Sequence, residues 1–171
     1  MEMLNEGAHI ARHEAGRAPG LPAAGEYLTY RVGDEEYGVD IQTVQEIRSY
    51  EQPTRIPGAP GFVKGVVNLR GVIVPIVDLR LRLECAKADY TPFTVVIVLN
   101  ARERMVGVVV DSVSDVMDLP AEAIKAPPEL VDSPASDFIT AIASAADRML
   151  MLVDMDRLLG ATLGQLPEQL S

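Results

Sequence analysis

The feature that most constrains the fold of this chain is an internal repeat of strand-like segments. Residues 37–47 align with residues 106–116 at an offset of 69 positions, which places Gly38 opposite Gly107. Glycine, valine, an acidic residue and aliphatic residues recur in the same order in both segments. A repeat on this scale indicates that one structural unit is present twice.

A second block of the same unit repeats at a different offset. Residues 62–66 align with residues 138–142 at an offset of 76 positions. The same offset aligns residues 72–79 with residues 148–155. One longer connection in the second copy, the proline-containing segment 119–137, accounts for the difference of 7 positions between the two offsets. Chance similarity between valine-rich strands is the alternative, but agreement at glycine and acidic positions favours duplication of a unit with four or five strands.

Hydrophobic patterning predicts that these units are built from strands. Residues 27–32 alternate in polarity, and residues 93–99 and 106–110 are apolar runs of strand length. Such patterns are typical of β-strands. Several short strands separated by glycine and charged turns indicate small barrels or sandwiches. The sequence therefore predicts a mainly β fold.

Helices are expected to be short. Asp154 is placed to cap a helix that runs through Leu159, with Gly160 just past its end. Asp78 is placed in the same way before residues 79–83.

The ends of the chain differ in composition from its middle. Residues 1–25 carry several glycines and prolines among small and polar residues, and residues 161–171 are similar. We therefore predict flexible tails at 1–25 and 161–171. The predicted folded domain is residues 26–160, and it contains both copies of the repeated unit.

One hairpin indicates a docking surface. Residues 64–80 contain two β-branched runs separated by the turn residues 68–71. This pattern predicts a tight turn that needs the backbone freedom of Gly71 and presents Arg70 at its end. A guanidinium on a rigid turn, with no nucleophile beside it, is suited to binding a partner. The second copy has Ala146 at the position of Arg70, so Arg70 is a candidate recognition residue and the flanking valines are assigned to the fold.

Composition excludes several kinds of partner. The net charge of −10 repels nucleic acid and anionic lipid surfaces, so a barrel that binds single-stranded nucleic acid is a disfavoured alternative. The single cysteine, Cys85, cannot form an internal disulfide. Apolar runs such as residues 95–99 are far shorter than the roughly 20 residues that span a bilayer. With no leader segment evident, we expect a cytoplasmic protein without direct membrane insertion.

The chemistry-bearing residues form no complete catalytic or metal site. His9 and His13 have the spacing of helical zinc ligands, but neither a third ligand nor a helix is predicted there. The serines lack a nucleophile elbow, and no phosphate-binding loop is present. Acidic residues at strand ends are interpreted as turn and cap residues rather than as the acid pair of a hydrolase: Asp40, Glu46, Asp78, Asp111, Asp115 and Asp154. No catalytic residue, metal or cofactor is therefore expected.

Several motifs together resemble the CheW-like family of chemotaxis coupling proteins. The matching segments are residues 33–41, 44–48, 64–80, 94–100, 110–116 and 147–150. The resemblance covers about residues 26–160. It is specific because the long segment around Asn-Leu-Arg-Gly matches throughout.

The resemblance implies two intertwined five-stranded SH3-like barrels. It also implies a non-enzymatic adaptor that joins transmembrane chemoreceptors to the histidine kinase CheA, in arrays beneath the membrane. A CheW-like scaffold that serves a non-chemotaxis chemosensory pathway is the alternative.

Partner-binding positions also follow from the resemblance. In the family the receptor's cytoplasmic helical tip docks between the barrels, and the kinase's CheW-like regulatory domain packs against barrel ends. The positions that match receptor-facing ones are Val44, Glu46, Arg70, Val95 and Val116. The positions assigned to kinase binding are Lys64, Gly65 and Leu130.

Overall fold

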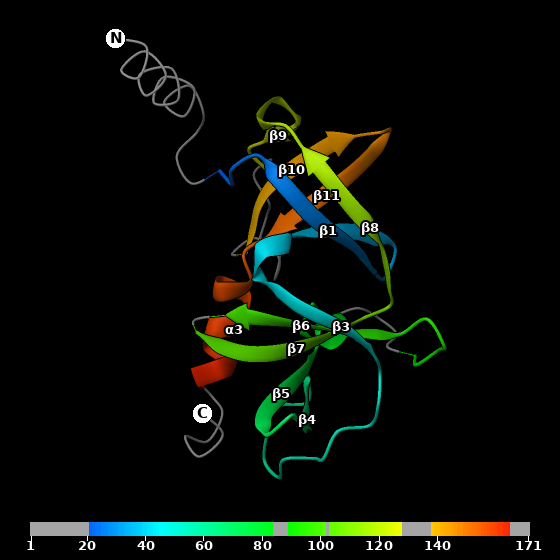
Figure 1. Cartoon of the computed structure of the whole chain (residues 1–171), viewed down its shortest axis with the longest axis vertical. Helices are drawn as coiled ribbons and strands as arrows, with labels where there is room; N and C mark the ends of the chain where they lie inside the picture. The colour runs from blue at the N-terminus through cyan, green and yellow to red at the C-terminus, as the bar shows by residue number, and fades with distance from the viewer. Residues whose placement is uncertain (1–20, 84–88, 102, 128–137, 165–171) are drawn as a thin grey trace.

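The computed structural model describes residues 21–83, 89–101, 103–127 and 138–164, and its strands form two sheets (Figure 1). The six-stranded sheet has the order β8-β1-β2-β11-β10-β9. Its strands are β1 (Gly25–Val32), β2 (Glu35–Asp40), β8 (Ser112–Leu119), β9 (Ile124–Lys125), β10 (Ile139–Ala145) and β11 (Arg148–Val153). The five-stranded sheet has the order β3-β6-β7-β5-β4. Its strands are β3 (Val44–Ser49), β4 (Val63–Leu69), β5 (Val72–Asp78), β6 (Val95–Ala101) and β7 (Arg104–Val110).

Strand pairing confirms the duplication. The antiparallel β1–β2 and β1–β8 pairs have counterparts in the β6–β7 and β6–β3 pairs. The antiparallel β10–β11 hairpin corresponds to the β4–β5 hairpin. Each subdomain also contains one parallel pair, β2–β11 in one and β5–β7 in the other. The predicted mainly β fold of two small intertwined barrels is therefore confirmed.

The two copies exchange their strands. The β1–β2 hairpin pairs, through β2, with β11 of the last hairpin rather than with the β4–β5 hairpin, which comes earlier in the chain. The chain passes to the five-stranded sheet after Asp40, returns near Asp111, and crosses again after Asp154, so that helix α3 (Met155–Gly164) contacts β6. Figure 1 shows α3 beside β6 and β7 of the five-stranded sheet.

Equivalent turns close the two late hairpins. Arg70 and Gly71, with φ values of 53° and 90°, connect β4 and β5. Ala146 and Asp147, with φ values of 52° and 61°, connect β10 and β11. Two successive residues with positive φ form the turn that matches the twist of paired strands. The predicted role of Gly71 is thus confirmed, and Arg70 does lie in the turn.

The largest apolar cluster lies between the two subdomains, and we call it the shared core. It draws buried side chains from both sheets and from the C-terminal helix, among them Tyr30, Tyr37, Val77, Ile97, Phe138 and Leu158. Smaller clusters around Leu119 and Val98 fill the individual subdomains. Burial of one large apolar side chain contributes about 1.5–3 kcal/mol. Moving the subdomains apart would therefore expose buried apolar side chains and destabilise the protein.

The helices begin where they were predicted, but one ends later. Asp78 Oδ1 accepts from the Arg80 amide at 3.0 Å before α2 (Leu79–Arg82), and Asp154 Oδ1 accepts from the Arg157 amide at 3.2 Å. Gly160 lies inside α3, so the prediction that it ends this helix is wrong. An internal glycine costs only about 1 kcal/mol, and burial of Leu158 and Leu159 just before it favours the continued helix. Two 3-10 helices, η1 (Ile41–Thr43) and η2 (Ala121–Ala123), complete the described elements.

The predicted tails lie mostly outside the described residues. Of residues 1–25, the structure describes 21 onward, and Leu21 packs against the inner cluster of the six-stranded subdomain. Within the described ranges, no helix is long and apolar enough to cross a membrane.

Candidate functional site

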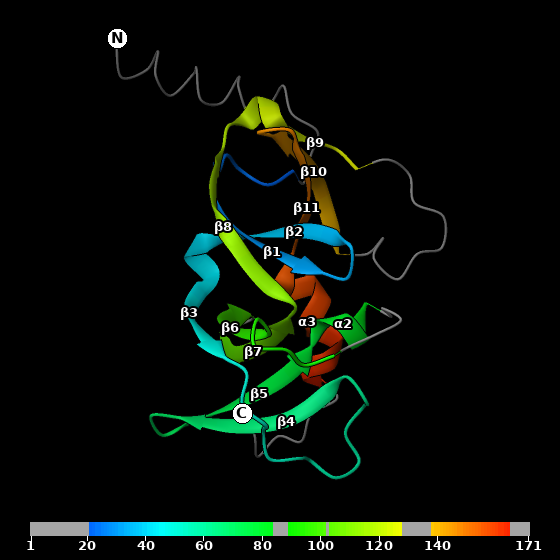
Figure 2. The ribbon, with the colours of Figure 1, turned by 90° about the vertical axis from the view of Figure 1, so that its right-hand side faces the viewer.

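Strands β3 and β8 flank the junction between the subdomains on one side of the molecule (Figures 1 and 2). Each is an edge strand: β3 pairs only with β6, and β8 pairs only with β1, among the described strands. The repeat relates the two strands, because Glu46 and Asp115 are 69 positions apart. Strands at the end of a sheet have backbone and side chains available to partners. This side of the molecule is therefore the candidate docking face.

The predicted recognition residue Arg70 pairs with Glu46. Its Nη2 lies 2.5 Å from Oε1 of Glu46, and Nη1 of Arg48 lies 3.3 Å from Oε2 of the same carboxylate. The hydrogen bond from Arg70 holds the pKa of Glu46 below its ordinary value. The turn is fixed by a 2.8 Å hydrogen bond from the Gly71 amide to Asn68 Oδ1. The Arg70 side chain is 69% exposed, so it is available to a partner and contributes little to the core.

Val44 and Val95 lie at the edge of the shared core. Both are half-buried and pack against it. Val44 is opposite Leu99 in the β3–β6 ladder, and Val95 is opposite Ser49. Ile47, also on β3, is 44% exposed. The structure thus brings these two predicted residues onto one sheet with Glu46 and Arg70.

Val116 lies on the other side of the junction. It is opposite Leu28 in the β1–β8 ladder and is 48% exposed. The five residues predicted to face a receptor therefore belong to both sheets, four on the five-stranded one and Val116 on the six-stranded one.

The predicted kinase-binding residues differ in accessibility. Lys64 is half-buried and lines a cavity of about 590 Å³. Gly65 is buried with a φ of 144°, and a Cβ there would lie 2.0 Å from the carbonyl oxygen of Thr54. Gly65 therefore lets the backbone at Thr54 approach β4 closely. Any influence of Gly65 on a partner would act through the segment around Thr54. Leu130 lies outside the described residues.

The sequence analysis missed the counterpart of the Glu46–Arg70 pair. Arg148 forms ion pairs with Asp115 at 3.0 Å and with Glu36 at 2.5 Å. Hydrogen bonds from Arg148 lower the pKa of both carboxyl groups. The repeat therefore does carry an arginine beside this turn, two positions after Ala146. The alignment of Glu46 with Asp115 in the repeat was the sequence feature that could have indicated this second pair.

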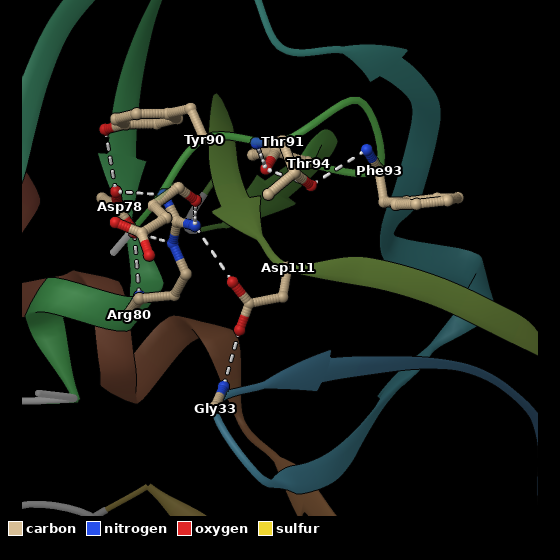
Figure 3. Close-up of polar contacts among 9 residues, drawn as sticks. Gly33, Asp78, Arg80, Tyr90, Thr91, Phe93, Thr94 and Asp111 are labelled. Carbon is tan, nitrogen blue, oxygen red and sulfur yellow. Dashed lines mark hydrogen bonds and ion pairs between the residues drawn. The ribbon is translucent and has the colours of Figure 1, made fainter. Parts of the chain in front are cut away.

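A buried ion cluster lies at the end of β7, where the chain passes between the subdomains (Figure 3). Arg80 and Asp78 are both fully buried, with Nη2 and Oδ2 2.9 Å apart. Arg80 Nη1 also lies 3.0 Å from Oδ1 of Asp111, whose Oδ2 accepts from the Gly33 amide at 2.7 Å. Although burial opposes the charged form, hydrogen bonds to Asp78 and Asp111 raise the pKa of Arg80. The cluster ties the β1–β2 turn to the five-stranded subdomain.

These contacts revise the interpretation of the acidic residues. Asp40, Asp78 and Asp154 cap backbone amides as predicted. Glu46, Asp111 and Asp115 hold arginine side chains, as Asp78 also does. Within the described residues no group of three His, Cys, Asp or Glu side chains could hold a metal ion. His9, His13 and Cys85 lie outside them.

Two small barrels with exchanged strands and a shared core define a duplicated β-domain, with the candidate docking face at the junction of its two subdomains. The CheW-like domain model matches residues 26–162, and the chain belongs to this family. The chemotaxis protein CheW of Klebsiella aerogenes is 52% identical over 136 residues, which are 80% of this chain and 82% of that protein. The chemotaxis protein CheW of Bacillus subtilis is 33% identical, over 77% of this chain and 85% of its own length.

A solved structure supports the same assignment. The crystal structure of the scaffolding protein TtCheW from Thermoanaerobacter tengcongensis superposes with a TM-score of 0.75 at 28% identity. The match covers 80% of this chain and 92% of that one. The family resemblance seen in the sequence is therefore confirmed.

Proposed function

We propose that this protein is a non-enzymatic adaptor that couples transmembrane chemoreceptors to the histidine kinase CheA in bacterial chemotaxis. It acts in the cytoplasm, at membrane-associated receptor arrays. The observation that carries the proposal is the shared core, which holds two subdomains with separate exposed surfaces in one fixed arrangement. The relatives named as chemotaxis proteins support the pathway.

The receptor's helical tip is assigned to the docking face. Val44, Val95 and Val116 provide apolar contacts at the junction, and Arg70 with Glu46 provides a charged contact beside them. An amphipathic helix is recognised by such a combination, because its apolar stripe packs on the valines while neighbouring charged groups set its position. The CheW-like regulatory domain of the kinase is assigned to the surface of Lys64, Gly65 and Leu130.

Coupling in this scheme depends on position. Both partners are held by one rigid body, so a displaced receptor displaces the kinase. Modest affinity at each contact suffices, since many copies in one array raise the effective concentration of every partner.

The charge reversal Arg70→Glu tests the receptor assignment. It places a second carboxylate beside Glu46 and removes the exposed guanidinium. We therefore expect the variant to lose binding of a receptor cytoplasmic fragment in a pull-down. Cooperative thermal unfolding should persist because the side chain lies outside the core. Arg157→Glu is the matched control: its side chain is 63% exposed on α3 and undergoes the same charge change.

The outcomes separate recognition from structure. Unchanged fragment binding by Arg70→Glu would remove Arg70 from the receptor site. Loss of the cooperative transition would make the Glu46–Arg70 pair structural. Kinase binding, measured on the same variant, should stay at the wild-type level.

A further inference from the structure

The cavity beside Lys64 has an unusual charge distribution. It lies between the β3–β4 connection and the segment before β6, and its volume is about 590 Å³. Among the described residues that line it, the charged ones are Arg55 and Lys64, and no carboxylate is present. The chain as a whole has a net charge of −10, so it is unusual that the charged residues of this lining are both positive.

Neither cation is neutralised within the described part of the chain. Arg55 and Lys64 form no ion pair or side-chain hydrogen bond there, whereas Arg70, Arg80 and Arg148 each pair with a carboxylate. Arg55 is exposed and Lys64 is half-buried. The cationic side of the cavity is thus open to a segment arriving from solvent.

Two tyrosines form an aromatic wall of the cavity, and contacts with other residues hold them in place. The rings of Tyr50 and Tyr90 stack with centroids 4.4 Å apart. Tyr90 donates to Asp78 Oδ2 at 3.1 Å, and the Arg80 guanidinium lies 4.8 Å from the Tyr90 ring centroid. Figure 3 shows this hydrogen bond, which links the wall to the buried ion cluster. The aromatic wall is therefore positioned before any ligand arrives.

The backbone that carries the two cations is also fixed. Thr54, next to Arg55, exchanges hydrogen bonds of 2.9 and 2.8 Å with Val66, two residues after Lys64. The close approach at Gly65 holds the same two segments together. Preorganised walls reduce the entropy lost on binding, so a short segment can bind with useful affinity.

We propose that this cavity receives an acidic segment of the kinase, with carboxylates on Arg55 and Lys64 and an apolar or aromatic side chain against Tyr50 and Tyr90. The inference rests on the proposed adaptor function and adds the chemistry of the segment that is recognised. Charge complementarity carries it, because neither cation has a side-chain partner among the described residues and a carboxylate forms charge-assisted hydrogen bonds with each.

The test measures kinase affinity as a function of salt. Full-length protein and purified CheA are titrated between about 0.05 M and about 0.5 M salt, where screening changes strongly. We expect Arg55→Ala and Lys64→Ala each to weaken binding about fivefold at low salt, and the double variant to lose most of the salt dependence. Lys125→Ala, an exposed lysine on β9 in the other subdomain, is the control and should match wild type.

Other measurements separate the possible failures. Receptor-fragment binding should be unchanged in all three cavity variants, and their cooperative unfolding should persist. Kinase affinity and salt dependence equal to those of Lys125→Ala would overturn the acidic-segment proposal while leaving the adaptor function intact. A wild-type protein that binds no kinase would overturn the adaptor function itself. Uptake of pyrophosphate into the cavity, seen by calorimetry, with unchanged kinase affinity would assign the site to a small anion and overturn the proposal.

Discussion

Ile76 lies so close to Gly107 that a Cβ on this glycine would be 2.6 Å from the Ile76 Cδ1 atom. The two residues are paired in the parallel β5–β7 ladder. Gly38 and Leu152, their counterparts by the two repeat offsets, are paired in the β2–β11 ladder, where the same distance is 2.9 Å. Both subdomains therefore use a glycine to let the exchanged hairpins approach each other.

The substitution Gly107→Ala should destabilise the protein by overpacking. The new methyl group would meet Ile76 and, at 2.8 Å, Val96 Cγ1. Overpacking of this kind costs about 1–3 kcal/mol, which urea unfolding would detect as a lower midpoint. Adding Ile76→Val removes the Cδ1 atom and should restore part of the lost stability. A double variant no more stable than Gly107→Ala would show that the contact with Ile76 is not the cause.

The substitution Gly65→Ala should cost more than Gly58→Ala. Both glycines have positive φ, 144° and 81°, but only Gly65 would place a Cβ against backbone, 2.0 Å from Thr54 O. Gly58 has no atom within 4 Å of that position. We expect a loss on the order of 3 kcal/mol for Gly65→Ala and about 1 kcal/mol for Gly58→Ala. Equal midpoints in denaturant would contradict the close approach of Thr54.

The buried Arg80 should be essential to stability. Replacement by methionine leaves the buried carboxylate of Asp78 without its cation, and breaking such a pair costs about 3–5 kcal/mol. The second change Asp78→Asn removes that charge and keeps an oxygen for the helix cap. The double variant should therefore recover a measurable part of the lost stability. Thermal unfolding of the two variants checks this. No recovery would show that the lost contacts to Asp111 and the Asp89 carbonyl dominate.

Acid sensitivity should depend on Arg148. Its hydrogen bonds lower the pKa of Glu36 from 4.5 and that of Asp115 from 3.8. A lowered folded-state pKa stabilises the protein fully above these ordinary values, and the stabilisation is lost as pH falls through the lower folded-state values. Arg148→Gln should therefore reduce the free energy of unfolding at neutral pH and flatten its dependence on pH below about 4.5.

Denaturant titrations across acidic pH, with Arg157→Gln as the control, measure this effect. Carboxyl titration by NMR gives the two pKa values directly. Parallel pH profiles for wild type and Arg148→Gln would exclude a role for this network in acid stability.

Periodicity made the strands and their duplication predictable. The offsets of 69 and 76 match the observed equivalence of β1–β3 with β6–β8 and of β4–β5 with β10–β11. Without the resemblance, the exchange of hairpins between copies was not predictable, because Gly38 fits a β2–β5 contact as well as the observed β2–β11 one. Local patterning also failed at Gly160, where burial of the preceding leucines outweighs the helix-ending tendency of glycine.

The candidate site was partly predictable for a similar reason. Arg70 could be placed at a turn from the sequence, since turn geometry is local. Its partner Glu46 is 24 positions away, and that pairing depends on how β3 packs beside the hairpin. The position of Arg55 and the stack of Tyr50 on Tyr90 depend on a long connection without regular periodicity, so no pattern indicated them.

The crossing path of the chain sets an order in which the protein can fold during synthesis. Strands β3 to β7 are consecutive and include every member of the five-stranded sheet. The β1–β2 hairpin is made first, yet its parallel partner β11 begins only at Arg148. We expect the middle of the chain to become protease-resistant on the ribosome while its earliest hairpin still lacks that partner.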